Sequence, residues 1–67
     1  MIYKLYVEVD NRLHLVAEDN YLSNLVKIID NEERQIAEKY NVGLPHFIIL
    51  GNNRVMLDEY RYRGQAV

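Results

Sequence analysis

The chain has 67 residues, a formal net charge of −2 at pH 7 and no cysteine. A chain of this length forms a single domain, residues 1–67, which buries only about 60% of its unfolded surface and has no disulfide or thiolate-metal site to stabilise it. The charge supplies no overall basic field for nucleic acids, and no apolar run reaches the roughly 18 residues of a membrane span. We therefore expect a soluble, cytoplasmic domain without a membrane partner.

The first two predicted elements are strands joined by a tight turn. Residues 2–9 alternate apolar and polar side chains, which is typical of a half-buried strand. Asp10 and Asn11 follow, and both residue types tolerate the positive φ angles of a hairpin turn. The alternation resumes at 12–17, so the pattern predicts a β-hairpin.

The register of this hairpin depends on the length of its loop. A two-residue turn would pair Val7 with His14 and set an apolar side chain against a polar one. A three-residue loop at 10–12 would instead pair Val7 with Leu15 and match apolar residues. We favour the longer loop, which places His14 on the outward face.

The central segment, 20–41, has the pattern of one amphipathic helix. At about 100° per residue, seven apolar side chains fall within an arc of roughly 120°. These residues are Leu22, Leu25, Val26, Ile29, Ile36, Ala37 and Tyr40. Asp19 or Asn20 can cap the first turn, and Gly43 is the predicted stop.

Glu33 conflicts with a single helix, because it lies near the middle of the apolar stripe, where an unpaired carboxylate is costly. The alternative divides the segment at Asp30. Residues 25–29 then form a strand, and Glu33 closes a capping box at the start of a shorter helix that ends near Tyr40.

In this alternative, a strand and a helix precede a strand led by Pro45 and a hairpin. That order, over residues 25–63, resembles the C-terminal half of thioredoxin-like domains, which have a proline at the place of Pro45. The resemblance implies a minimal thioredoxin-like βαβαββ domain. It implies no redox activity, since the Cys-x-x-Cys pair is missing.

The last predicted elements form a second hairpin. A β-rich run at 46–50 and an alternating segment at 54–62 flank a turn at Asn52-Asn53. This turn would pair Leu50 with Val55 and Ile48 with Leu57. With one helix at 20–41, the fold class is α+β: a four-stranded, mostly antiparallel sheet in the order ββαββ, with the helix packed on one face.

The sequence contains few groups for catalysis or metal binding. His14 and His46 are far apart in the chain, and neither has a second ligand at a metal-binding spacing. No glycine-rich phosphate loop is present, and Ser23 has no partner at a recognisable spacing. We expect a non-enzyme with no cofactor and no metal.

The C-terminal segment is the candidate binding site. Tyrosine stacks on bases and arginine binds phosphates, but both residue types are also enriched in protein interfaces. The candidate binding residues are Arg54, Tyr60, Arg61, Tyr62 and Arg63. Tyr6 and Tyr21 add aromatic surface that the core pattern does not use, which favours self-association.

We therefore expect a small non-catalytic interaction module of the accessory or inhibitor type, which binds a protein partner or assembles as a homodimer. The alternative hypothesis is a single-stranded nucleic-acid-binding protein that uses the Tyr/Arg strand.

Overall fold

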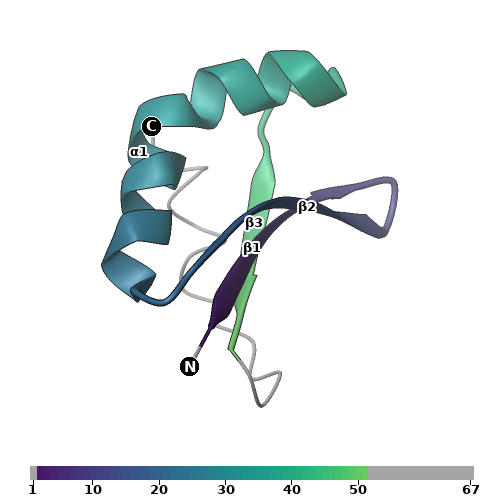
Figure 1. The fold of residues 1–67 in the computed structure, drawn as a ribbon. Helices are drawn as coiled ribbons and strands as arrows, with labels where there is room; N and C mark the ends of the chain where they lie inside the picture. The colour runs from purple at the N-terminus through teal and green to yellow at the C-terminus, as the bar shows by residue number, and fades with distance from the viewer. Residues whose placement is uncertain (1, 52–67) are drawn as a thin grey trace.

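The computed structural model describes residues 2–51, which form a three-stranded antiparallel sheet and one helix. In chain order the elements are β1 (Tyr3–Val9), β2 (Arg12–Asp19), α1 (Leu22–Tyr40) and β3 (His46–Leu50) (Figure 1). The expected α+β class is confirmed. The predicted fourth strand, 54–62, lies outside the described residues.

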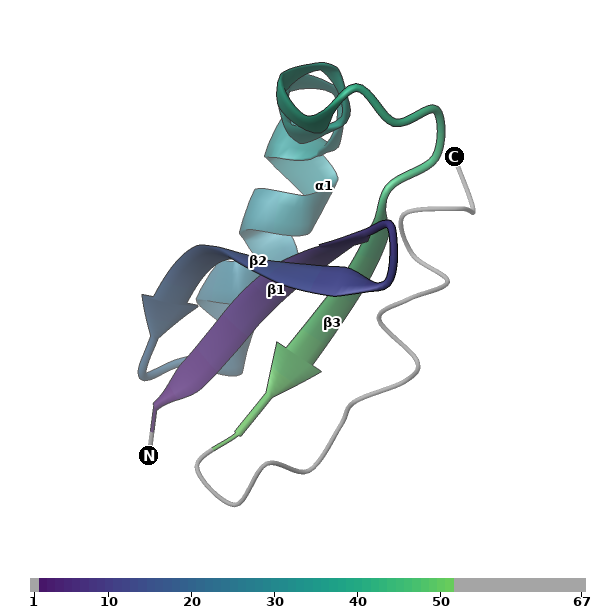
Figure 2. The same ribbon diagram turned by 90° about the vertical axis from the view of Figure 1, so that its right-hand side faces the viewer.

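Strand β1 lies in the middle of the sheet and pairs antiparallel with both β2 and β3. Strands β2 and β3 therefore run in the same direction, and α1 connects them across one face of the sheet. Figure 2 shows the helix behind the sheet, with the other face toward the viewer. In the part of the chain that the structure describes, no helix covers that other face.

The first hairpin has a two-residue turn, so the preferred three-residue loop was wrong. Asp10 and Asn11 both have positive φ, 52° and 64°, and the register pairs Val7 with His14. Positive φ at both central residues is the type I′ geometry, whose twist matches that of the flanking strands. The conformational preference of this dipeptide outweighs the matching of apolar pairs.

A bulge in β2 restores part of the apolar match. The register shifts between Leu5 and Tyr6, which pair with Ala17 and Leu15, so Val16 is the extra residue. Val16 and Ala17 then pack against the core beneath α1. The bulge thus recovers two apolar side chains for the helix-covered face.

The central segment is one continuous helix, which confirms the single-helix prediction and contradicts the strand at 25–29. The thioredoxin-like arrangement, which needs that strand, is therefore wrong for this chain. Figures 1 and 2 show that the axis bends: the first part of α1 runs along the sheet, and the second part turns across its end. Buried side chains lie in both halves, Leu25 and Ile29 before Ile36.

The helix begins at Leu22, two residues into the predicted segment 20–41, with Tyr21 at the N-cap in place of Asp19 or Asn20 and no side-chain cap bond. Asp19 still holds the entry to the helix. Its Oδ1 accepts hydrogen bonds from the Tyr21 backbone N–H at 2.8 Å and from the Asn24 side-chain amide at 3.1 Å. These bonds favour the charged carboxylate and hold the pKa of Asp19 below its ordinary value.

The helix ends at Asn41 rather than at the predicted stop, Gly43. Asn41 is left-handed, with φ 55° and ψ 49°, whereas Gly43 has no positive φ. The N–H of Val42 donates to the carbonyl of Ala37 at 2.9 Å, and that of Asn41 to Glu38 at 3.2 Å. This pair of bonds is the Schellman motif, for which asparagine is an accepted alternative to glycine.

We expect Asn41→Ala to lower the free energy of unfolding by about 1 kcal/mol, because a left-handed backbone strains a residue with an ordinary Cβ. Asn41→Gly is expected to be at least as stable as the parent chain. Urea unfolding followed by circular dichroism measures both variants. Equal stability of the alanine and glycine variants would show that the helix does not end in this conformation.

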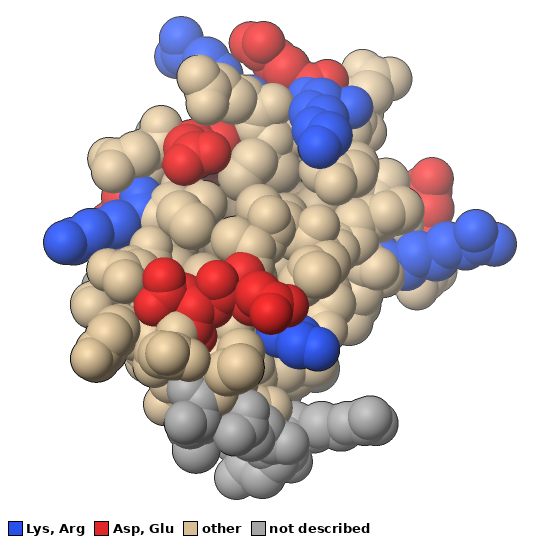
Figure 3. Space-filling model, viewed as in Figure 1, with Lys and Arg blue, Asp and Glu red and all other residues tan. Residues whose placement is uncertain are grey.

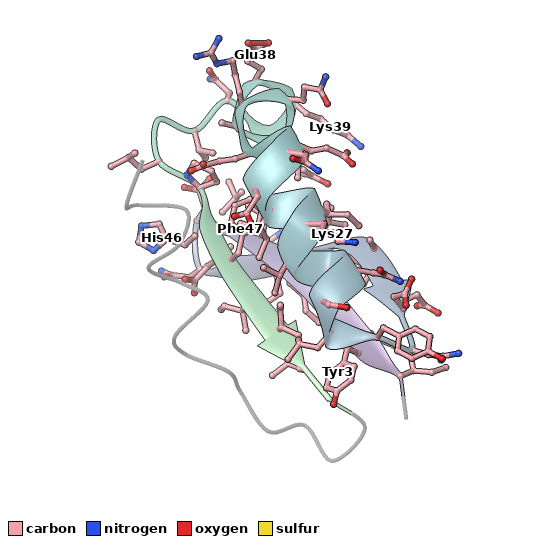
Figure 4. All side chains as sticks on the ribbon, turned by 90° about the vertical axis from the view of Figure 1, so that its left-hand side faces the viewer. Tyr3, Lys27, Glu38, Lys39, His46 and Phe47 are labelled. Atoms are coloured by element: carbon pink, nitrogen blue, oxygen red, sulfur yellow. The ribbon has the colours of Figure 1, made fainter. Side chains whose placement is uncertain are left out.

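The core lies between α1 and the sheet. Its buried residues come from all elements except β2, and partly buried side chains, including those of Tyr3 and Tyr40, pack around them. The buried core residues are Leu5, Val7, Leu25, Ile29, Ile36, Phe47 and Ile49. Figure 4 shows Phe47 between β3 and the helix. The predicted place of Tyr40 on the core side of the helix is confirmed.

His14 faces the helix and not outward as predicted. The two-residue turn places it on the covered face opposite Val7, and its ring lies 5.2 Å from the ring of Tyr40, tilted by 41°. Lys39 Nζ lies 5.5 Å from the centre of the same tyrosine ring. Contacts of this kind are favourable, so Tyr40 links the end of α1 to β2.

Glu33 is partly buried, as its place in the apolar stripe predicts. Burial, and then the nearby charge of Asp30, raise the pKa of Glu33 above its ordinary value. A raised pKa means that the folded state holds a proton more tightly than the unfolded state does. Glu33 therefore contributes most to the stability of the folded chain at a pH below its ordinary pKa. This contribution is lost as the pH rises through the raised pKa.

We expect Glu33→Gln to stabilise the chain at pH 7 by about 0.5 kcal/mol, because it removes the like-charge pair with Asp30 and a partly buried charge. The gain should disappear below pH 4, where the parent carboxyl is protonated. Thermal unfolding at several pH values measures the difference, with the exposed Glu32→Gln as the matched control. A gain that stays constant down to low pH would contradict this role of Glu33.

Candidate interaction surface

We call the sheet face that points away from α1 the open face. Side chains alternate between the two faces of a strand, and directly paired residues share a face. The register therefore arranges the open face as three rows across β2, β1 and β3. The rows are Glu18–Lys4–Leu50, Leu15–Tyr6–Ile48 and Leu13–Glu8–His46.

Exposure on the open face is uneven. Leu13 and Leu15 of β2 are 43% and 50% exposed, and Tyr6 of β1 is half-buried. Ile48 of β3 is only 1% exposed, although it lies outside the core cluster beneath the helix. The open face therefore presents its exposed apolar side chains on β2, whereas Ile48 on β3 is buried.

Two local features place the leucines on this face. The two-residue turn puts His14 on the helix side, and Leu13 and Leu15 consequently point the other way. The bulge at Val16 then turns Val16 and Ala17 toward the core. Leu13 and Leu15 are left on the open face. The positive-φ preference of Asp10-Asn11 was the signal in the sequence for this surface.

Charged side chains surround the leucines on both sides. Lys4 and Glu8 lie on β1, two residues to either side of Tyr6, and the register places Lys4 opposite Glu18. Over the side of the molecule drawn in Figure 3, basic and acidic side chains are interspersed, without a large basic patch. On the open face itself, Lys4, Glu8 and Glu18 supply both signs of charge, as at the rim of many protein interfaces.

The outer edge of β2 is a less suitable docking site than its face. Within the described sheet β2 is an end strand, and such strands offer unpaired backbone groups to other chains. The bulge at Val16, however, interrupts the regular spacing of these groups. Bulges in edge strands discourage strand-to-strand pairing, so the exposed leucines are the stronger feature.

The two histidines lie on opposite faces of the sheet. His14 pairs with Val7 on the helix side, and His46 pairs with Glu8 on the open face. Figure 4 shows His46 away from the helix. Across residues 2–51 no group of three or more potential ligands is placed to hold a metal ion.

A shallow hollow at the start of β1 is open to solvent and offers a small molecule little enclosure. It is lined by Ile2, Glu18, Asp19 and Asn20.

The residues that the sequence singled out for binding, Arg54, Tyr60, Arg61, Tyr62 and Arg63, lie outside the described residues. Tyr6 and Tyr21 are the two described tyrosines that the core pattern does not use. Tyr6 is half-buried on the open face, and Tyr21, at the start of α1, is 69% exposed. In the described part of the chain, no helix is both long enough and apolar enough to span a bilayer.

Comparisons with protein-family models, with curated proteins and with solved structures each found no significant match to this chain.

Proposed function

We propose that the chain is a small non-catalytic interaction module that binds a protein partner through the exposed half of its open face. This exposed half consists of Lys4, Tyr6 and Glu8 of β1 and Leu13, Leu15 and Glu18 of β2. The observation that carries the proposal is the exposure of Leu13 and Leu15, which project side by side from β2 away from the core.

Adjacent exposed leucines beside a tyrosine favour binding over a purely structural role. Burying a fully exposed leucine contributes roughly 1.5 to 3 kcal/mol, and because about half of each side chain is still available for burial, a partner would gain about half of that from each leucine. A ring of mixed charge around an apolar centre is the usual composition of a protein interface. No comparable apolar pair faces solvent from α1 in the described chain.

The proposal includes a fourth strand at 54–62, paired with β3. Strand β3 ends the described sheet on that side, and the predicted hairpin pairs Ile48 with Leu57. Because Ile48 faces away from α1, Leu57 would join it on the open face. The burial of Ile48 on a face that the helix does not reach supports this arrangement. The binding surface would then be limited to the exposed half.

Affinity capture with matched baits tests the function. Three baits are used on extracts of the source cell: the wild-type chain, Leu15→Lys and Lys27→Glu. Lys27→Glu is the control, because Lys27 is exposed on the outer side of α1 (Figure 4). A protein held by the wild type and by Lys27→Glu, but not by Leu15→Lys, is then purified and titrated into isotope-labelled chain. We expect the amide resonances of Tyr6, Leu13 and Leu15 to shift, and Leu15→Lys to bind at least about tenfold more weakly.

Two results would overturn the proposal. One is that every recovered protein binds Leu15→Lys as tightly as the wild type. The other is that the resonance changes map to the outer side of α1 and leave the exposed half unchanged.

Single-stranded nucleic acid is the competing ligand. An electrophoretic titration with single-stranded DNA and RNA is expected to show no salt-sensitive complex, because the chain has a net charge of −2. Salt-sensitive binding that is lost in the Arg61→Ala, Arg63→Ala double variant would replace the proposed function with nucleic-acid binding.

A further inference from the structure

We infer that β2 has a second, less populated register, in which the bulge at Val16 moves into the hairpin turn and the exposed leucines turn beneath α1. This inference rests on the proposed function, because it names how the same surface is regulated. It is carried by the pairing on the two sides of the bulge. We call the pairing that the structure shows the bulged register, and in it Leu13 and Leu15 are exposed.

The pairs at the far end of the hairpin already define the second register. Residues 3–5 pair with 17–19 without an inserted residue. We call the continuation of this pairing along the whole hairpin the regular register, since it contains no bulge. It ends in a three-residue loop at 10–12. It has three new apolar or aromatic pairs: Tyr6 with Val16, Val7 with Leu15 and Val9 with Leu13.

The change of register exchanges side chains between the faces of β2, because a shift by one residue turns each side chain to the other face. Leu13 and Leu15 move beneath α1, and His14 and Val16 move to the open face. Leu15 takes the place of His14, whose ring lies 5.2 Å from the Tyr40 ring in the bulged register. The regular register therefore withdraws both leucines from the exposed half.

Each register has its own advantage, so the free-energy difference between them is small. The bulged register keeps Asp10 and Asn11 at φ 52° and 64°, in a type I′ turn that both residue types accept. The regular register replaces a histidine and a valine beneath α1 with two leucines, which are the more apolar pair. Its loop, however, requires the left-handed conformation at Arg12, which is costly for residues other than glycine. Arg12 therefore keeps the bulged register as the main state.

The exchange regulates binding through the population of the bulged register. A partner that buries Leu13 and Leu15 binds this register only, so it draws molecules out of the regular one. We expect the regular register in about 1 to 10% of the free molecules. A change in the turn then alters binding without altering any residue of the exposed half.

NMR relaxation dispersion on the full chain measures a minor state of this size, because such rearrangements occur in microseconds to milliseconds. We expect the amides of 10–16 to exchange and those of 17–19 to stay unaffected, since residues 17–19 have the same partners in both registers. The minor-state chemical shifts of 13–16 should be those of a strand. Shifts typical of an unfolded segment would overturn the inference, because they would show fraying of the hairpin.

Two glycine variants in the turn test the direction of the exchange. Arg12→Gly removes the cost of the left-handed conformation at the third loop residue. We expect it to raise the ratio of regular to bulged register about 5- to 30-fold. Asn11→Gly strengthens the type I′ turn, so we expect its exchange to fall below detection. Each variant is the control for the other, since a general loosening of the turn by glycine would act equally in both.

Leu15→Lys provides a second route to the same answer, because lysine is a poor replacement for His14 beneath α1, and we expect its exchange to disappear. A wild-type chain without a second state overturns the inference, as does equal exchange in Arg12→Gly and Asn11→Gly. If the exchange is absent but a protein binds the exposed half, the second register fails and the proposed function stands. If the exchange has this pattern but every captured protein binds Leu15→Lys as tightly as the wild type, the proposed function fails and the second register stands.

Discussion

Asn31→Pro is expected to destabilise the chain by about 3 kcal/mol or more, because proline in a helix interior removes a backbone hydrogen bond and clashes with the preceding turn. Asn31 is exposed in the middle of α1, so no lost side-chain contact complicates the result. A domain of this size has a total stability of only several kcal/mol. We therefore expect most of the variant to be unfolded at 37 °C by circular dichroism.

The same variant separates the two interpretations of the central segment. If a short helix began at Asp30, Asn31 would be its first helical residue, where proline is well tolerated. Ser23→Pro is the matched control, since Ser23 is exposed in the first turn of α1, and we expect it to cost less than about 1 kcal/mol. Similar stabilities for the two proline variants would contradict a continuous α1.

Phe47→Ala is expected to cost about 3 to 5 kcal/mol, the largest effect of a single side-chain truncation in this chain. Phe47 is 0% exposed and lies where β3 meets the helix (Figure 4). Removing its ring leaves a cavity that the small core cannot close without moving α1. Chemical denaturation of the purified variant measures the loss.

Leu44→Ala is the matched control for Phe47, because Leu44 lies three residues earlier and is 61% exposed. We expect its free energy of unfolding to stay within about 0.5 kcal/mol of the parent value. A cost near 1 kcal/mol for Phe47→Ala would show that α1 does not pack on β3 as described.

The fold class could be predicted from the sequence because two strong periodic patterns determine it. Alternation at 2–9 and the helical stripe at 20–41 each include enough apolar residues to fix the type of element. Glu33, the one residue that conflicts with the helical stripe, does lie on its partly buried side, as the pattern indicates. The helix continues through it, and burial raises the pKa of its carboxyl. A single unfavourable carboxylate did not outweigh the apolar stripe.

The exposed surface could not be predicted in the same way, because it depends on single residues. Apolar pairing favoured Leu15 opposite Val7, whereas the backbone preference of Asp10-Asn11 placed His14 there. The bulge at Val16 then returns Val16 and Ala17 to the core side after the mismatched pair of His14 and Val7. The alternation of apolar and polar residues does not predict such an inserted residue. The end of the helix was missed for a similar reason, because Asn41 adopted the left-handed conformation that Gly43 was expected to supply.

The position of Leu15 is the basis of the proposed binding surface, and methyl nuclear Overhauser effects measure it directly. We predict cross-peaks from the Leu15 methyls to the Tyr6 ring and none to the Ile29 methyls, together with cross-peaks between the rings of His14 and Tyr40. Cross-peaks from Leu15 to Val7 and Ile29 would place Leu15 beneath the helix. That result would contradict the register, the open face and the function proposed for it.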